Sequence, residues 1–170
     1  MNCTAAKVHE IWRAWQQLGI AGFIGGRYTG RPGSTATTRA EVGTNVPASN
    51  RVPGGWTLMY YLNTSDHAWL NADNYGHVML FGGDKGAYNG QFTTEPVLFV
   101  QEAYELDKKI DDGLPRTGTV RPWNNYWLPS SSPGPTAGAG TSYCISGSDR
   151  YEIHDDKSTY VCSMIFIPGF

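Results

Sequence analysis

The chain has 170 residues, of which 40% are hydrophobic and 16% are charged, and its formal net charge is −2. This length suits one domain with a single core, and the hydrophobic content excludes a disordered chain. A nearly neutral charge gives no electrostatic reason to expect a nucleic acid as a partner. Because Gly, Pro, Ser, Thr and Asn are plentiful, we expect turns and half-buried strands, and a location outside the cytoplasm, rather than a salt-bridged helical bundle.

The first predicted element is an amphipathic helix over residues 8–23, where apolar residues recur at intervals of three and four. Gly25 and Gly26 are expected to end this helix. Its pattern begins almost at Met1, so we expect it to be the remainder of a longer helix. Residues 28–53 show no periodicity and predict a long loop.

Three segments after this loop have the composition of strands. They are WTLMYYL, HAWLNA and GHVMLFGG, and Asn, Asp and Gly turn signals separate them. They predict an antiparallel meander. Near the C-terminus, SYCISG and YVCSMIF predict two further strands that lie side by side.

A second helix is predicted between the meander and the C-terminal strands. Thr94 is expected to cap it, and Pro96 to lie in its first turn, where the missing N–H group is harmless. One apolar face is expected to carry Phe99, Ala103, Leu106 and Ile110.

Two late cysteines, Cys144 and Cys162, fall in the two predicted C-terminal strands. In an oxidising compartment a disulfide between them would close a loop of about 20 residues and stabilise the fold by about 3 kcal/mol. No metal-ligand spacing such as CxxC accompanies them, which favours a disulfide. The alternative is a pair of buried free thiols. Cys3 is left over.

The second helix ends in the stretch LDKKIDDGLPRTG, where Asp111 and Asp112 oppose the helix macrodipole. Lys108 and Lys109 can compensate for these charges, and Lys108 is spaced to pair with Asp112. We expect the Asp side chains to bond backbone amides of the following turn, and Gly113 to take a left-handed conformation. On this interpretation the stretch is a corner that returns the helix to the sheet.

Two other functions are open to the same stretch. Clustered carboxylates suit a Ca²⁺ ion, and Asp107, Asp111 and Asp112 are the candidate ligands, although the stretch lacks the spaced ligands of a dedicated calcium loop. The letters LPRTG match a sortase signal, but no apolar span and basic tail follow them directly. We interpret that match as a coincidence.

Three stretches in order resemble bacterial type IV pilin-like proteins. YELDKKIDDGLPRTGTVR resembles their pattern of a helix ending in Lys-Ile-Asp-Asp-Gly, followed by Pro, Thr-Gly and a basic residue. WRAWQQLGIAGFIGGRYTG is similar to the region after their hydrophobic stalk, and NVPASNRVPGGWTLMYY to their linker and first strand. Together these stretches cover about half of the chain. The corner motif comprises Lys109, Ile110, Asp111, Asp112, Gly113, Pro115, Thr117 and Gly118.

The resemblance implies an α+β, pilin-like fold. A truncated N-terminal amphipathic helix would pack on an antiparallel β-sheet, with a second helix and a C-terminal strand pair. Residues 1–170 would form one globular domain. It would comprise the remainder of the long helix (1–26), a loop (27–55), and the sheet, second helix and C-terminal region (56–170).

The resemblance also implies a function as a pilin, minor pilin or pseudopilin in a type IV pilus or a type II secretion-like filament. Such filaments serve adhesion, motility or secretion. The partners would be other pilins, and the location the cell surface or a periplasmic pseudopilus. The precursor would be held in the inner membrane by a stalk, cut by a peptidase and N-methylated. The stalk and its glutamate are absent from this sequence, which we interpret as a truncation.

An alternative function is an extracellular adhesin or carbohydrate-binding module. Aromatic side chains among Asn and Gly can stack on sugar rings. The candidates are Trp69, Tyr75, Trp123, Tyr126 and Trp127. Their other expected role is packing in the core or against neighbouring subunits.

No constellation of residues predicts an enzyme. The histidines stand outside any ligand-spaced pair, no nucleophile elbow is present, and FGGDKG lacks the spacing of a phosphate loop. The histidines are His9, His67, His77 and His154. A polar stretch near the C-terminus carries Asp149, Asp155 and Asp156, which we expect to face solvent or, alternatively, to bind a cation. We therefore expect no cofactor, with Ca²⁺ as the alternative.

Overall fold

The structure is a computed structural model that describes residues 10–33, 39–61, 75–84, 91–123, 144–145, 150–153 and 160–168. In these residues two helices accompany a four-stranded antiparallel sheet, which confirms the predicted α+β class. The elements are α1 (Glu10–Ile20), β1 (Gly55–Tyr61), β2 (Gly76–Gly82), α3 (Val100–Ile110), β3 (Val120–Trp123) and β4 (Ser163–Phe166). Within the same residues, neither helix is long and apolar enough to cross a bilayer.

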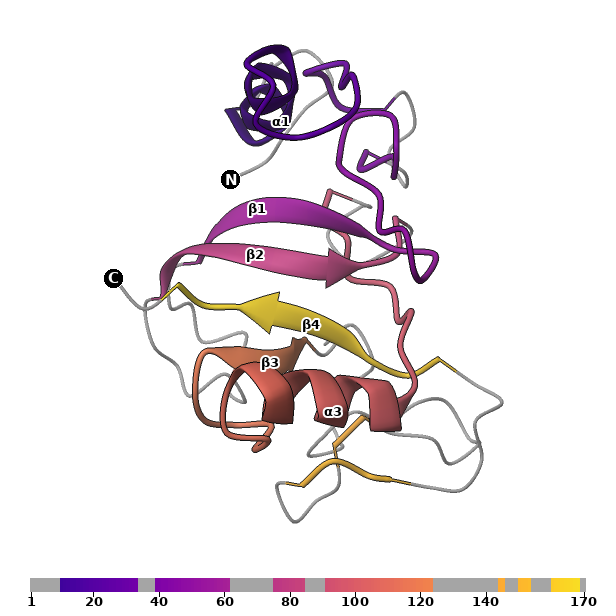
Figure 1. Cartoon of the computed structure of the whole chain (residues 1–170), viewed down its shortest axis with the longest axis vertical. Coiled ribbons are helices and arrows are strands. Elements are labelled where there is room, and N and C mark those ends of the chain that lie inside the picture. The colour runs from indigo at the N-terminus through magenta and orange to yellow at the C-terminus, as the bar shows by residue number, and fades with distance from the viewer. Residues whose placement is uncertain are drawn as a thin grey trace.

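The sheet has the strand order β1-β2-β4-β3 (Figure 1). β1 and β2 pair along their whole length, from Gly55 opposite Gly82 to Tyr61 opposite Gly76. WTLMYYL and GHVMLFGG thus form strands as predicted, but they pair directly with each other, so the predicted meander with HAWLNA between them is wrong. HAWLNA itself lies outside the described residues. Because side chains alternate along a strand, this register separates two apolar faces. One carries Trp56, Leu58, Met79, Phe81, Val120, Met164 and Phe166, and the other Tyr61, Val78, Leu80, Trp123 and Ile165.

The predicted C-terminal strand pair is wrong. β4 lies between β2 and β3, with Ile165 opposite both Leu80 and Arg121. The segment at Cys144 is not its neighbour in the sheet, because Ile145 instead forms an isolated bridge with Tyr151. β3 was not predicted from the sequence, since it is short and contains a proline.

α1 ends at Ile20, before the predicted end at residue 23. Gly22 follows with φ 75°, and its N–H donates to the carbonyl of Gly19, while the N–H of Phe23 donates to that of Leu18. These bonds form a Schellman motif, in which the left-handed residue ends the helix. The predicted breakers Gly25 and Gly26 lie further along the same turn.

α1 lies beyond the edge strand β1 rather than across the sheet (Figure 1). Trp12 and Trp15 form the buried side of the helix, and the loop residues Ala40 and Val46 complete this cluster. The expected packing of the helix on the sheet is therefore limited to side chains near its edge. Those are Trp56, Leu58 and Met79.

α3 begins at Val100, so the predicted cap at Thr94 is wrong. The chain before α3 is extended, because Glu95 exchanges two backbone hydrogen bonds with Gly83 and Leu98 forms a bridge with Cys162. Thr94 itself is fully buried. The N-cap residue is instead Phe99, whose N–H donates to the Glu102 carboxylate at 2.9 Å. This is one half of a capping box, because the Phe99 side chain has no acceptor for the reciprocal bond.

The buried side of α3 is rotated from the predicted one. Val100, Ala103 and Asp107 are buried, whereas 56% of Ile110 is exposed. This side packs on the cluster that includes Phe81, Val120 and Met164.

Candidate functional site

Several hydrogen bonds between side chains and backbone join the corner after α3. The helix ends at Ile110, and the N–H of Asp111 still donates to the carbonyl of Asp107 at 2.6 Å. Gly113 follows with φ 73°, the left-handed conformation expected from the sequence. The chain then turns through residues 114–119 to reach β3.

The Asp111 carboxylate connects the end of α3 to the beginning of β3. Its Oδ2 accepts a hydrogen bond from the N–H of Val120 at 3.0 Å and another from the N–H of Thr119. Gly118 lies against the same carboxylate, and a Cβ atom at this position would overlap it. Gly118 also has φ 69°, so two separate constraints favour glycine there.

The Asp112 carboxylate organises the turn itself. Its Oδ1 accepts from the N–H of Leu114 at 2.8 Å, and its Oδ2 from the hydroxyl of Thr117 at 2.5 Å. The Thr117 hydrogen bond is the main cause that lowers the pKa of Asp112 below its ordinary value.

The predicted ion pair between Lys108 and Asp112 is wrong. The ammonium of Lys108 lies over the ring of Tyr104, 5.4 Å from its centroid. The reason is geometric, because both oxygens of Asp112 are engaged by the turn ahead of the helix.

Asp107 connects the same corner to a distant part of the chain. It is fully buried, its Oδ1 accepts from the N–H of Gly113 at 3.2 Å, and its Oδ2 accepts from the hydroxyl of Tyr151 at 2.7 Å. Burial raises the pKa of Asp107 above 3.8, and the bonds from Tyr151 and Gly113 act in the opposite direction. Burial and Asp107 also raise the pKa of Tyr151.

From the sequence, Asp107 was predicted only as a metal ligand, and its partner Tyr151 was not predicted. The spacing of Asp107 could have indicated its burial, since it lies four residues after Ala103 and seven after Val100, on the buried side of the helix. A buried carboxylate at such a position requires hydrogen-bond donors.

A disulfide joins Cys144 to Cys162, with Cα atoms 5.2 Å apart. Tyr151 lies within the 18-residue span that this bond closes. The disulfide and the Asp107–Tyr151 hydrogen bond therefore hold one segment at two points, against the sheet and against α3.

The calcium candidates do lie together. Asp107, Asp111 and Asp112 each offer an oxygen, and the three atoms are within 4.8 Å of one another. Protein donors already engage both oxygens of Asp107 and Asp112 and one oxygen of Asp111. These hydrogen bonds explain the grouping without an ion, so it does not indicate a metal site.

The described aromatic candidates do not form a sugar platform. Trp123 is only 3% exposed, so the expectation that it presents a ring face to a ligand is wrong. Tyr75 is half-buried, and its hydroxyl accepts a hydrogen bond from Arg121 at 2.9 Å while its ring lies 5.5 Å from that of Tyr61.

Other candidates are separate from the corner. His77 makes an edge contact with Tyr60, with ring centroids 5.0 Å apart. The remaining candidates lie outside the described residues. They are Cys3, His9, His67, Trp69, Tyr126, Trp127, Asp149, His154, Asp155 and Asp156.

Comparison with known proteins identifies no relative: no family model, curated protein or solved structure matches the chain.

Proposed function

We propose that this chain is the globular domain of a type IV pilin-like structural subunit, a pilin, minor pilin or pseudopilin that assembles with other pilins into a filament. The observation that carries the proposal is the corner after α3. The stretch that resembles the pilin pattern is also the one whose side chains connect helix to sheet, through Asp111 and Val120. In this role the motif is architectural and has no catalytic task.

The disulfide is consistent with this role. Disulfides persist outside the cytoplasm, where pili and pseudopili lie, and they stabilise small domains exposed to that environment. The bond between Cys144 and Cys162 fixes the C-terminal region on the sheet.

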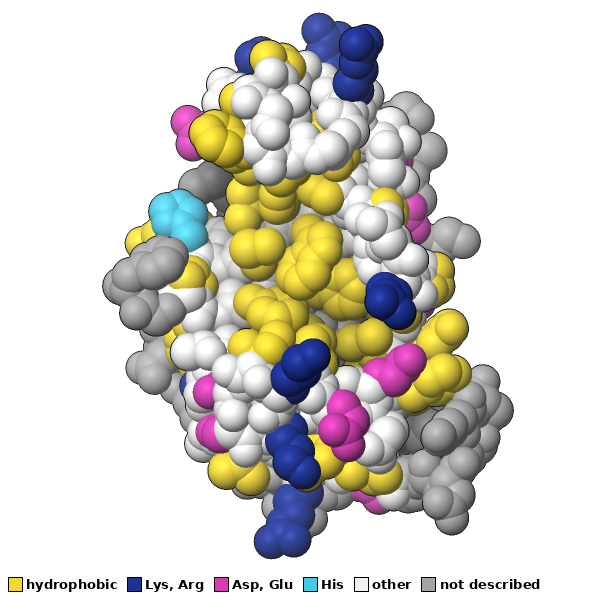
Figure 2. Space-filling view, viewed as in Figure 1, with side chains coloured by type: hydrophobic (Ala, Val, Ile, Leu, Met, Phe, Trp, Pro, Cys, Tyr) yellow, Lys and Arg dark blue, Asp and Glu magenta, His cyan; other side chains and the backbone are white. Residues whose placement is uncertain are grey.

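An apolar band on the sheet gives the proposal a second support. Figure 2 shows hydrophobic side chains gathered between α1 and α3. The register places Trp56, Leu58, Met79 and Phe166 on this face of the sheet, and each is only partly buried. A continuous apolar surface is typical of a protein that buries it in an assembly.

The proposal is tested on the surface of the producing cell. Filaments sheared from the cells are probed with antibodies raised against this chain, and a strain without prepilin peptidase serves as the control. We expect the protein in the sheared fraction of the parent strain and its retention in the membrane fraction of the control. Release as a free protein from both strains would contradict a filament subunit.

We do not propose carbohydrate binding through Trp123, because its side chain is buried. A Trp123→Ala variant would therefore test packing in the core rather than contact with a ligand. Tyr75 is engaged within the protein, because its hydroxyl accepts a hydrogen bond from Arg121 and its ring contacts that of Tyr61.

A further inference from the structure

Two large apolar side chains stand in solvent at the end of α1. Ile20 is 81% exposed and Phe23 is 79% exposed. Phe23 follows Gly22 in the Schellman motif, at the position whose side chain frequently packs back on the helix. Here it does not pack back, so the turn presents an apolar residue outward.

The end of α1 and the turn that follows it form a tip, which is held in place by its own hydrogen bonds. The Tyr28 hydroxyl donates to the carbonyl of Gly25 at 2.7 Å, and the Gln16 amide donates to the carbonyl of Thr29 at 3.2 Å. The first bond closes the turn on itself, and the second holds the chain after the turn against the helix. The exposure of Ile20 and Phe23 is therefore a feature of a defined turn.

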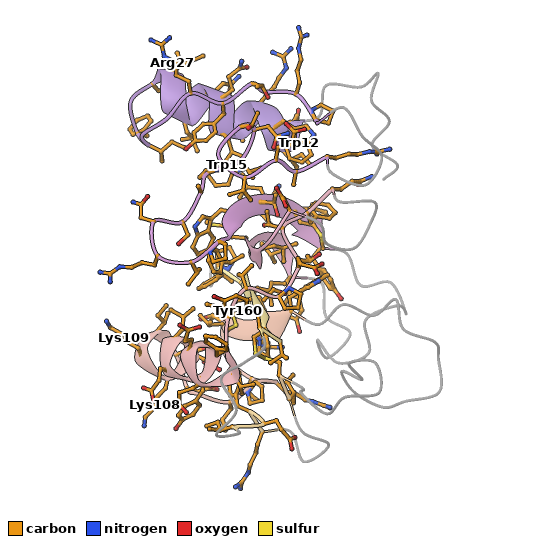
Figure 3. The ribbon with its side chains drawn as sticks, turned by 90° about the vertical axis from the view of Figure 1, so that its right-hand side faces the viewer. Trp12, Trp15, Arg27, Lys108, Lys109 and Tyr160 are labelled. Carbon is orange, nitrogen blue, oxygen red and sulfur yellow. A yellow bond between two sulfur atoms is a disulfide. The ribbon has the colours of Figure 1, made fainter. Side chains whose placement is uncertain are left out.

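Three arginines lie on α1 or in the chain that follows it. Arg13, Arg27 and Arg31 are exposed, and within the described chain no ion pair joins them to an acid. Figure 3 shows Arg27 on the side of α1 opposite Trp12 and Trp15, which face the sheet. Figure 2 shows basic side chains at the α1 end of the molecule and others near α3.

Charge is also segregated along the chain. The described residues between 10 and 61 contain five arginines and two acids, an excess of three positive charges. The described residues after 61 contain five basic and eight acidic side chains, an excess of three negative charges. A neighbouring anionic surface would therefore be attracted more to the first of these two stretches, which contains α1, than to the second, which contains α3.

We propose that the tip formed by Arg13, Ile20, Phe23, Arg27 and Arg31 docks on the surface of an anionic lipid bilayer. Ile20 and Phe23 enter the boundary between headgroups and acyl chains, and the arginines bind lipid phosphates. Apolar side chains combined with Arg and Lys are the composition that binds such interfaces. This inference does not depend on the filament proposal.

The shape of the tip favours a bilayer over a protein partner. Two protruding side chains on a tight turn offer little of the roughly 800 Å² per partner that a stable protein interface buries. Lipid headgroups rearrange around a narrow protrusion, so a small apolar tip with adjacent cations is sufficient.

The test is flotation of the purified chain with two kinds of vesicles, one of phosphatidylcholine alone and one of phosphatidylcholine mixed with phosphatidylglycerol. We expect binding only to the vesicles with phosphatidylglycerol, and weaker binding as salt is added. Ile20→Ser with Phe23→Ser should lower the partition coefficient at least about tenfold. Arg13→Gln and Arg27→Gln should each lower it about fivefold.

The other end of the molecule supplies a matched control. Ile110 and Leu114 are 56% and 50% exposed beside Lys108 and Lys109, but they adjoin the acidic corner. Ile110→Ser with Leu114→Ser should leave vesicle binding unchanged. Circular dichroism melts of each variant separate loss of binding from loss of folding.

Three results would overturn the inference. The first is no binding to either kind of vesicle at low salt, and the second is binding that the control pair removes but the tip variants retain. The third is a tip variant that changes the oligomeric state in light scattering without changing flotation, because the tip would then contact a second copy of the chain.

Discussion

The Asp111 carboxylate, one residue beyond α3, accepts a hydrogen bond at 3.0 Å from the backbone N–H of Val120, the first residue of β3. Thr119 donates to the same oxygen. A negative charge at the C-terminal end of a helix is unfavourable, and these charge-assisted bonds offset that cost. One side chain thus determines where β3 begins relative to α3.

Asp111→Ala should therefore destabilise the domain by about 2 kcal/mol, because it leaves two backbone donors without their acceptor. Asp111→Asn keeps one acceptor oxygen and should cost about half as much. Urea unfolding measures both changes. Glu105→Ala, at an exposed position of α3, is the control and should change stability by less than about 0.5 kcal/mol. Equal losses of stability for the variants at residues 105 and 111 would show that the Asp111 carboxylate has no structural role.

Gly118→Ala should be among the more damaging glycine substitutions in the described chain. The new Cβ atom would meet the Asp111 carboxylate at a residue whose φ is 69°. We expect a loss of about 3 kcal/mol from strain and displaced hydrogen bonds. Gly43→Ala isolates the strain, because Gly43 has φ 81° and open space around it, and should cost about 1 kcal/mol. Similar losses for the two variants would show that the contact with Asp111 is unimportant.

Cleavage of the disulfide should lower the free energy of unfolding by about 3 kcal/mol. Cys144→Ser and a reducing agent should have the same effect on a denaturant melt, and the agent should not affect the variant further. Cys3→Ser should retain the full response to the reducing agent. A wild-type melt that the agent leaves unchanged would exclude a stabilising bond between Cys144 and Cys162.

The buried Asp107 should make the stability of the fold depend on pH. Its folded-state pKa is raised above the ordinary value of 3.8 mainly by burial, so the neutral carboxyl is favoured in the folded state. Its contribution to stability is then fully present below pH 3.8 and is lost as the pH rises through the folded-state pKa. Asp107→Asn lacks this titration. The melting temperature of the wild type relative to this variant should therefore fall as the pH rises from about 3 to 7.

The opposite trend would mean that the hydrogen bonds from Tyr151 and Gly113 outweigh burial. Tyr151→Phe serves as the companion variant, because it removes one donor and retains most of the packing. It should raise the pKa of Asp107 further and extend the loss of stability to higher pH.

Local patterns predicted the features whose causes are local. The left-handed Gly113, the turn bonds of Asp112 and the strand conformation of β1 and β2 all follow from neighbouring residues. The closeness of Cys144 and Cys162 was also inferred, although from a strand pairing that does not exist.

The missed features depend on contacts between distant parts of the chain. Thr94 caps no helix, because the bridges of Glu95 with Gly83 and Leu98 with Cys162 hold that segment extended. β3 contains Pro122, which a strand accepts here because β3 is at the edge of the sheet. Asp107 is buried because Tyr151 reaches it from another part of the chain, and helical spacing alone does not reveal that partner.

The filament proposal is tested most directly by mass spectrometry of the N-terminal peptide of the native protein from the producing cell. We expect an N-methylated apolar stalk upstream of Cys3, which would establish a processed pilin-like subunit. A mature terminus near Asn2, or one left by an ordinary secretory signal, would contradict this function and make the chain a freely exported domain.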